Sequence, residues 1–174
     1  MAEGNPMLEA KPASASEAVM TQVILPSDAN PLNAAFGGRV MEWIDICGGV
    51  AAGRHCRHAV VTASMDDLHF HTPIGVGWVV TLRARVLAAF RTSMEVGVTV
   101  HAENLLTGAE HLTTSALLTF VALNPDGTKA LVPPLELKTE AERLAFAEAH
   151  VRRKARLERK QSGGSWQAVM LRHP

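Results

Sequence analysis

The stretch Gly38-Arg-Val-Met-Glu-Trp-Ile-Asp-Ile-Cys-Gly-Gly-Val-Ala-Ala52 decides the fold of this chain. It begins with a run that favours helix, and its apolar side chains fall on nearly every face of that helix. A helix that is apolar nearly all round is normally enclosed by other structure. We therefore predict a buried helix over about residues 38–56, with the rest of the domain built around it.

Three segments after this helix alternate apolar and polar residues with a period of two. Such alternation is typical of strands with one buried face, and the short links around 91–93 and 106–108 predict antiparallel pairing. A further short strand is expected at 23–25, ending at Pro26. The pattern predicts an α+β fold in which a curved antiparallel sheet wraps around the helix. The expected buried positions are Trp78, Val80, Leu82, Ala84 and Val86, then Met94, Val96, Val98 and Val100, then Leu112, Ala116, Leu118 and Phe120.

The composition indicates one compact domain. The chain has 174 residues, of which 47% are hydrophobic and 20% charged, and its formal net charge is zero. A neutral chain with few aromatic residues is a poor match to nucleic-acid binding. The sequence has no apolar run long enough to insert in a membrane and no signal-peptide pattern at the N-terminus, so we expect a cytoplasmic location. Cys47 and Cys56 lie too far apart along one helix for a disulfide and are expected to be reduced.

The chain divides into four expected parts. Residues 1–17 lack periodicity and are predicted to be flexible, 18–137 form the main domain, 138–160 form a basic helix, and 161–174 form a disordered tail. Residues 141–160 contain seven Lys or Arg against three Glu. This excess fits either a solvated helix face or a site for a polyanion, whose phosphates arginine binds well.

The residues just before the central helix suggest acyl-transfer chemistry. The sequence Asp28-Ala-Asn-Pro-Leu-Asn-Ala-Ala-Phe-Gly-Gly38 places a glycine pair at the expected helix start. Free N–H groups gather at such a start, and glycine lets a ligand approach them closely. The side chain of Asn30 offers one more N–H donor, so Asn30 and Gly38 form a candidate oxyanion site.

Asp45 is the candidate base or nucleophile, because it stands among apolar residues of the same helix. Seven residues separate Gly38 from Asp45, which corresponds to about 10 Å along a helix axis. One helix cannot easily bring both to a single carbonyl. We therefore expect a site shared between two subunits of an isologous dimer. Glu42, one turn before Asp45, is the competing candidate for the base.

At these residues the chain resembles the hotdog-fold acyl-CoA thioesterases of the cytosolic acyl-CoA hydrolase type. The resemblance spans about residues 20–160 and one position departs from it, since Asn33 stands where the family usually has glycine. Asparagine tolerates positive φ better than other non-glycine residues, so the turn is expected to survive. The matching segments are 28–45, Val61-Thr-Ala-Ser-Met-Asp66, Phe70-His-Thr-Pro73, Arg91-Thr-Ser-Met-Glu-Val96, Phe120-Val-Ala-Leu123 and Val132-Pro-Pro-Leu135.

The resemblance implies the hotdog fold and hydrolysis of fatty acyl-CoA to a free acid and CoA, with Asn30 and Asp45 as the catalytic pair. It implies no cofactor beyond the CoA of the substrate, and an assembly of at least a homodimer, with relatives often trimers of dimers. The residues expected to bind substrate or CoA are Phe36, Gly37, Arg91, Thr92, Ser93 and Arg153.

Two other functions remain open from the sequence. A hotdog hydratase or dehydratase would normally need a histidine at the site, and none stands between residues 28 and 45. A non-catalytic acyl-CoA sensor would bind without turnover. His69 and His71 alternate on a strand without a third ligand at suitable spacing, so no metal site is predicted.

Overall fold

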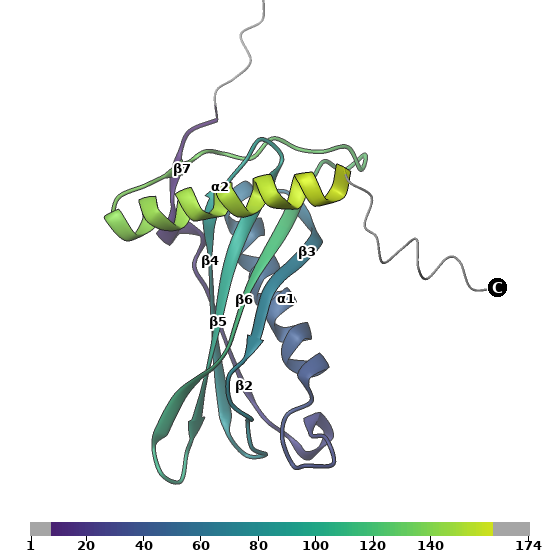
Figure 1. Ribbon diagram of the computed structural model, residues 1–174, viewed down its shortest axis with the longest axis vertical. Helices are drawn as coiled ribbons and strands as arrows, with labels where there is room; N and C mark the ends of the chain where they lie inside the picture. Colours follow the sequence, from purple (N-terminus) through teal and green to yellow (C-terminus); the bar gives the residue numbers. More distant parts are fainter. Residues whose placement is uncertain (1–7, 162–174) are drawn as a thin grey trace, which may run out of the picture.

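A computed structural model describes residues 8–161 as a five-stranded sheet that curves around one helix (Figure 1). The chain begins with β1 (Lys11–Pro12), η1 (Ala13–Ser16), β2 (Ala18–Val23) and η2 (Pro26–Asp28). The central helix α1 (Gly37–Cys56) follows. The remaining elements are β3 (Ala59–Phe70), β4 (Val79–Ala89), β5 (Ser93–Asn104), β6 (Ala109–Leu123), β7 (Leu135–Glu136) and α2 (Glu140–Gln161).

The main sheet is antiparallel throughout and has the strand order β2-β4-β5-β6-β3. Three successive strands, β4 to β6, form its centre because short turns join them and each strand pairs with the next along most of its length. β2 and β3 form the two edges, so one long side of each has no strand partner within the described residues. The small strands β1 and β7 pair in parallel beside the sheet. The antiparallel curved sheet predicted from the alternation is confirmed.

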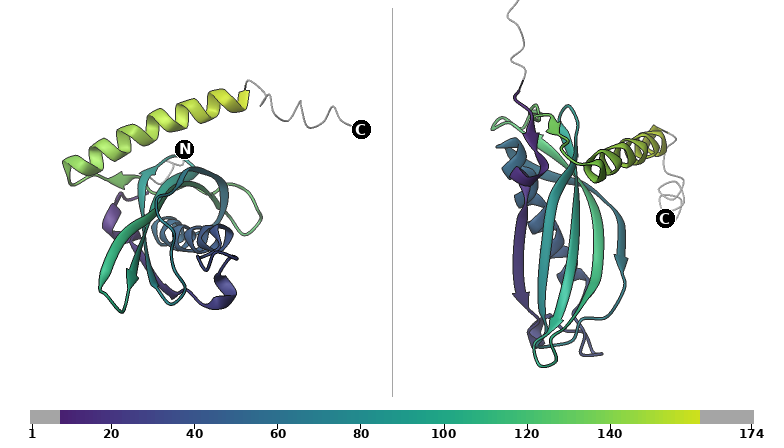
Figure 2. Two further views of the ribbon diagram at one scale, coloured as in Figure 1. Left: turned by 60° about the horizontal axis from the view of Figure 1, so that its bottom comes forward. Right: turned by 90° about the vertical axis from the view of Figure 1, so that its left-hand side faces the viewer.

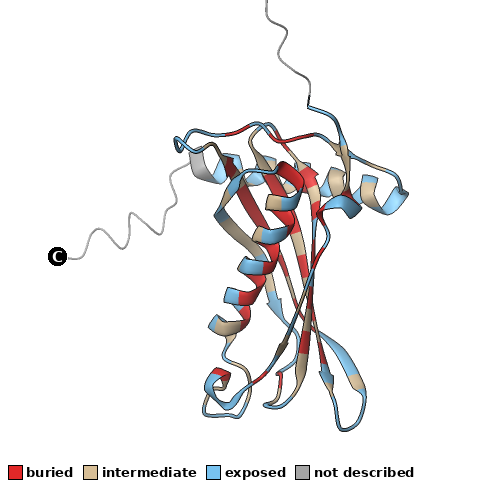
Figure 3. Ribbon diagram, turned by 180° about the vertical axis from the view of Figure 1, so that it is seen from behind, coloured by how far each residue is buried: buried red, intermediate tan, exposed pale blue. Residues whose placement is uncertain are grey.

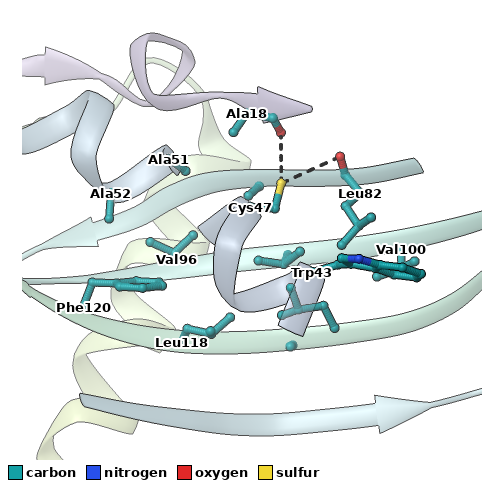
Figure 4. Close-up of a cluster of buried hydrophobic side chains, with 14 of the residues drawn as sticks. Ala18, Trp43, Cys47, Ala51, Ala52, Leu82, Val96, Val100, Leu118 and Phe120 are labelled. Carbon is teal, nitrogen blue, oxygen red and sulfur yellow. Dashed lines mark hydrogen bonds between the residues drawn. The ribbon is translucent and has the colours of Figure 1, made fainter. Parts of the chain in front are cut away.

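The core lies between α1 and the concave face of the sheet (Figure 4). The alternation predicted this core correctly for β4 and β5, whose inward residues are fully or almost fully buried. Helix α1 adds Val40, Trp43, Ile44, Cys47 and Ala51 from the opposite side. Its bounds match the predicted range within one residue. It ends where Arg57 adopts the left-handed conformation (φ 58°) and donates its N–H to the Gly53 carbonyl.

Only one side of α1 is covered by the residues that the structure describes. Seen from behind, the buried residues of α1 follow the side against the sheet, and exposed residues follow the other side (Figure 3). The exposed side carries Met41, Ile46 and Val50, each more than a third exposed. The expectation of an enclosed helix is therefore wrong for residues 8–161 of a single chain, because they supply one sheet to cover it. This apolar face is a candidate for contact with a second copy.

Helix α2 crosses the outer, convex face of the sheet, opposite α1 (Figure 2). Glu95 points to this outer face, as the alternation predicted, but its side chain is 1% exposed because α2 covers it. Arg152 of α2 donates to Glu95 Oε1 from Nε (3.0 Å) and Nη2 (2.6 Å). Arg156 pairs with Asp66 at 2.8 Å. Part of the basic excess of α2 is thus used to hold the helix on the sheet.

Two details of the strands differ from the prediction. The first edge strand occupies Ala18–Val23, whereas a strand was expected at 23–25. The ladder to β4 fixes this position, since Val23 pairs with Val79 at the first residue of β4 and Pro26 then begins η2. Leu112 was expected inside and is 43% exposed. A register shift between Val100 and His101 turns Leu112 outward and Thr113 inward.

The N-terminal segment that was predicted to be flexible contains β1 and η1 in its described part. Ala13 and Ser16 of η1 are buried, and the Ser16 hydroxyl accepts the N–H of Val86 at 2.9 Å. The predicted tail begins at Gln161, which is the last residue of α2, and the rest of it lies outside the described residues. None of the helices in residues 8–161 has the length and apolar character that crossing a membrane requires.

Candidate active site

The loop between β2 and α1 is held by an ion pair. Asp28 is 6% exposed, its Oδ1 accepts Arg39 Nε at 2.8 Å, and its Oδ2 accepts the Leu25 N–H at 3.0 Å. The Arg39 guanidinium and the Leu25 N–H lower the pKa of Asp28 below its usual range. The Phe36 N–H closes the loop onto the Asp28 carbonyl at 2.7 Å. Asp28 therefore fixes the loop that carries Asn30.

Asn30 folds back on its own loop in an Asx turn. Its Oδ1 accepts the N–H of Leu32 at 2.9 Å and of Ala34 at 3.3 Å. Because the carbonyl end is held in this way, the amide N–H₂ is the end that can donate to a ligand. Asn33 adopts φ 55°, so the prediction that it would tolerate positive φ is confirmed. The second carboxamide of the loop thus stands at the turn itself.

The start of α1 is not capped by a side chain. Phe36 is the N-cap residue and forms no side-chain cap, so the glycine N–H groups of the first turn are available to a ligand. The glycines also leave room for aromatic rings. A Cβ added at Gly38 would meet Cε1 of Phe36 at 3.2 Å. One at Gly37 would meet Cζ of Phe70 at 3.5 Å, in ordinary contact.

Asp45 lies on the side of α1 next to the edge strand β3 and is partly exposed. Its Oδ1 accepts the hydroxyl of Thr62 at 2.5 Å. The sequence did not single out Thr62, although it stands in a segment that matches the family. Glu42, the competing base, instead pairs with Arg39 Nη1 at 2.8 Å. Asp45 is therefore the carboxylate with an orienting partner on a neighbouring strand.

The predicted site residues form separate groups within one chain. Asn30, Phe36, Gly37 and Gly38 lie at the loop and the start of α1, and Asp45 lies about two turns further along the same helix. The segment 91–93 lies at the other end of β4, about 30 Å away along the strand. Arg153 is on α2, with Cζ 4.5 Å from the centre of the Phe90 ring. Arg153 and the 91–93 turn are thus neighbours of each other and not of Asn30.

The cysteines and histidines that the sequence raised lie apart from this site. Cys47 and Cys56 are free and buried, and burial raises the pKa of both thiols. Cys47 Sγ lies 3.8 Å and 3.9 Å from the carbonyl oxygens of Ala18 and Leu82 (Figure 4). The rings of His69 and His71 stack 6.2 Å apart. No group of three or more metal-ligating side chains occurs within residues 8–161.

A hollow of about 570 Å³ lies on the outer face of the sheet, away from Asn30 and Asp45. Its lining includes Arg83, Arg85, Gly97 and His69 but no residue of the loop 28–38 or of α1. The predicted site residues of the loop and of α1 therefore lie apart from this hollow.

Comparisons with known proteins identify the family. The thioesterase superfamily model matches residues 32–109. An uncharacterized acyl-CoA thioester hydrolase of Bacillus subtilis is 41% identical over 145 residues, which cover 83% of this chain and 84% of that protein. Mammalian relatives are longer. The chain matches 26% of the rat acetyl-coenzyme A thioesterase, at 37% identity, and 39% of the human cytosolic acyl coenzyme A thioester hydrolase, at 33% identity.

The similar solved structures are also acyl-CoA thioesterases or hydrolases. A hexameric acyl-CoA thioesterase without ligand superimposes with a TM-score of 0.84 at 39% identity, covering 88% of this chain and 98% of that one. An acyl-CoA hydrolase from Staphylococcus aureus, solved with butyryl coenzyme A, coenzyme A and coenzyme A disulfide, gives 0.82 at 30% identity, covering 93% and 98%. Structures of that enzyme also exist with alanine in place of an Asn, an Asp and a Thr.

The sequence match extends over most of the chain and of its bacterial relatives, and the fold, the glycine-rich helix start and the Asp45–Thr62 pair all lie within it. This chain belongs to the hotdog-fold acyl-CoA thioester hydrolases of the thioesterase superfamily.

Proposed function

We propose that the chain hydrolyses fatty acyl-CoA thioesters to the free acid and CoA at a site that two copies share. Asn30 and Gly38 of one copy bind the thioester carbonyl oxygen, and Asp45 of the neighbouring copy acts as general base or as nucleophile. The observation that carries the proposal is the Asx turn of Asn30, which leaves its N–H₂ group as the donor end, in the loop leading to an uncapped helix start.

Three variants of the Staphylococcus aureus enzyme support these assignments. The replaced Asn and Asp are 15 positions apart, and the replaced Asp and Thr are 17 apart. Asn30, Asp45 and Thr62 have the same separations in this chain. The hydroxyl of Thr62 donates to Asp45, so we assign Thr62 to the positioning of the carboxylate.

The shared site follows from the geometry of α1. Gly38 and Asp45 stand about 10 Å apart along the helix, which is too far for one carbonyl carbon and its oxygen. A two-fold axis passing near the middle of this interval, at Met41 or Glu42, brings Gly38 of one copy toward Asp45 of the other. The exposed side of α1 and the unpaired edge of β3 lie where such a partner would pack.

The assembly and the location are proposed from relatives. Two similar solved structures are described as hexameric, so we propose a trimer of such dimers. A mammalian relative is described as cytosolic, and we propose a cytoplasmic location for this chain.

The chemistry needs few groups. Attack on the thioester places negative charge on the carbonyl oxygen, which the Gly38 N–H and the Asn30 amide stabilise, each donor contributing about 3 kcal/mol. Asp45 removes a proton from the attacking water, or attacks the carbonyl carbon itself to form a mixed anhydride that water then cleaves. CoA leaves as a thiolate, which is a good leaving group, so no strong general acid is required.

The test is the release of CoA thiol from acyl-CoAs of increasing chain length. We expect turnover by the natural chain and a loss of roughly a hundredfold or more in kcat for Asn30→Ala and for Asp45→Ala. Glu42→Ala serves as the matched control on the same helix. Saturable acyl-CoA binding with no thiol released would refute the proposal, and a larger loss for Glu42→Ala than for Asp45→Ala would refute the choice of carboxylate.

A further inference from the structure

An aromatic ring from the far end of β3 packs against the start of α1. Phe70 is the last residue of β3, and its Cζ, Cε1 and Cε2 are the nearest atoms to a Cβ built on Gly37. On the next residue, Gly38, the nearest atoms belong to the ring of Phe36. Two phenylalanine rings therefore border the two glycines whose N–H groups begin the helix.

Within a single chain both rings are open to solvent. Phe36 is 60% exposed and Phe70 is 51% exposed. Exposed apolar surface is unfavourable by about 25 cal/mol per Å², and neither ring belongs to the core around α1. If the glycine N–H groups hold a carbonyl oxygen, this aromatic surface can bury the apolar group attached to that carbonyl.

The position of Phe70 is fixed relative to the loop that carries Asn30. The segment that follows Phe70 accepts the Ala35 N–H at the Ile74 carbonyl (2.8 Å) and forms a bridge between Gly75 and Ala34. On its other side the His71 N–H donates to the Thr113 carbonyl at 2.8 Å. Backbone hydrogen bonds thus link the segment after Phe70 to the loop that carries Asn30.

We infer that Phe70 contacts the acyl chain of the substrate next to its thioester and contributes to the selection of chain length. The inference rests on the proposed thioesterase site. The rings of Phe70 and Phe36 lie directly beside Gly37 and Gly38, whose N–H groups are proposed to hold the thioester carbonyl. An acyl chain is apolar throughout and suits these two rings, whereas the pantetheine arm of CoA carries amide groups that need polar partners.

The test compares kcat/KM for palmitoyl-CoA and acetyl-CoA in the natural chain, in Phe70→Ala and in Phe70→Leu. We expect the palmitoyl-to-acetyl ratio to fall about tenfold in Phe70→Ala, mainly through KM, with Phe70→Leu between the two. Leu106→Ala is the control, because Leu106 is 96% exposed in the turn between β5 and β6. Light scattering on each variant reports its assembly.

An unchanged ratio in an active Phe70→Ala would overturn the inference and leave the proposed function intact. So would an equal loss at every chain length, or loss of the assembly in both Phe70 variants, since either result would mean a structural role. Absence of thiol release by the natural chain with any substrate would overturn the proposed function and this inference with it.

Discussion

At the scale of single residues, Thr62 and Asp45 form the most specific contact of the candidate site. The hydroxyl holds one carboxylate oxygen, so removing it would leave Asp45 free to rotate. A hydrogen bond to a charged group contributes about 1.5–3 kcal/mol, and we expect Thr62→Ala to lower kcat about 10- to 100-fold with little change in KM. Thr62→Ser retains the hydroxyl and should recover most of the rate. Equal losses in both variants would contradict a positioning role.

His55 gives a pH-dependent contribution to stability. It is fully buried in α1, Nε2 lies 2.9 Å from the Pro133 carbonyl oxygen, and Nδ1 has no hydrogen-bond partner in the described chain. Burial lowers the pKa of His55 below its ordinary value of 6.5. The unfolded chain therefore binds a proton that the folded chain does not, so this contribution is complete above pH 6.5 and is lost as pH falls below it.

We accordingly expect the urea midpoint to fall between pH 7.5 and about 5, and to fall less in His55→Gln, which can still donate to the Pro133 carbonyl. Asp28, whose pKa is lowered, also contributes to stability, and this contribution is lost only at more acidic pH, below the ordinary pKa range of a carboxyl. Identical pH slopes for the natural chain and His55→Gln would rule out this assignment.

Sequence reasoning identified some residues of the candidate site and missed others. Asn30, the glycine pair and Asp45 stand in or beside one short segment, so their types and spacing were readable. Thr62 and Phe70 belong instead to the strand β3, which is separate in sequence from the loop and from α1. Their positions depend on how β3 lies beside α1, which the residue pattern of either element does not encode.

At the scale of elements, α2 is fixed to the sheet by a buried ion pair. Removing one partner of such a pair leaves an unpaired buried charge and costs about 3–5 kcal/mol. We expect Arg152→Ala to lose stability on this scale, since Glu95 would remain buried with only the more distant Arg156, 3.7 Å from its Oε2. Lys154→Ala, at an exposed position of the same helix, should change stability by less than about 0.5 kcal/mol.

Urea unfolding measures the difference between the Arg152 and Lys154 variants, and hydrogen exchange in α2 locates it. Faster exchange confined to 140–161 would show that the helix has loosened from the sheet. Equal stability of the two variants would mean that the apolar contacts of Phe90, Phe146 and Ala149 hold α2 without the ion pair.

The long elements were predictable and the irregular ones were not. An all-round apolar run and three alternating segments define α1 and β4 to β6 within the chain itself. Leu112 was assigned to the wrong face because one shift of register reverses every side chain beyond it. The first edge strand was misplaced because the hydrogen bonds to β4 fix its ends, and its alternation is weak.

At the scale of the whole molecule, a single chain cannot form the proposed site, because that site combines residues of two copies packed on the exposed side of α1. Sequence reasoning inferred the second copy from the distance of about 10 Å between Gly38 and Asp45 along one helix, which is too long for both residues to reach a single carbonyl. The arrangement of that copy could not be predicted, because it depends on the shapes of two surfaces and not on a repeating pattern.

Mixed dimers test the shared site directly. A dimer of one Asn30→Ala chain and one Asp45→Ala chain has one site with both substitutions and one site with both natural residues. If the two variants are unfolded together and refolded as a mixture, about half of the dimers are mixed and each carries one intact site. The preparation should then recover about a quarter of natural activity, although each variant alone is nearly inactive. If Asn30 and Asp45 served the same site from one chain, every site would lack one of them, and mixing would restore nothing.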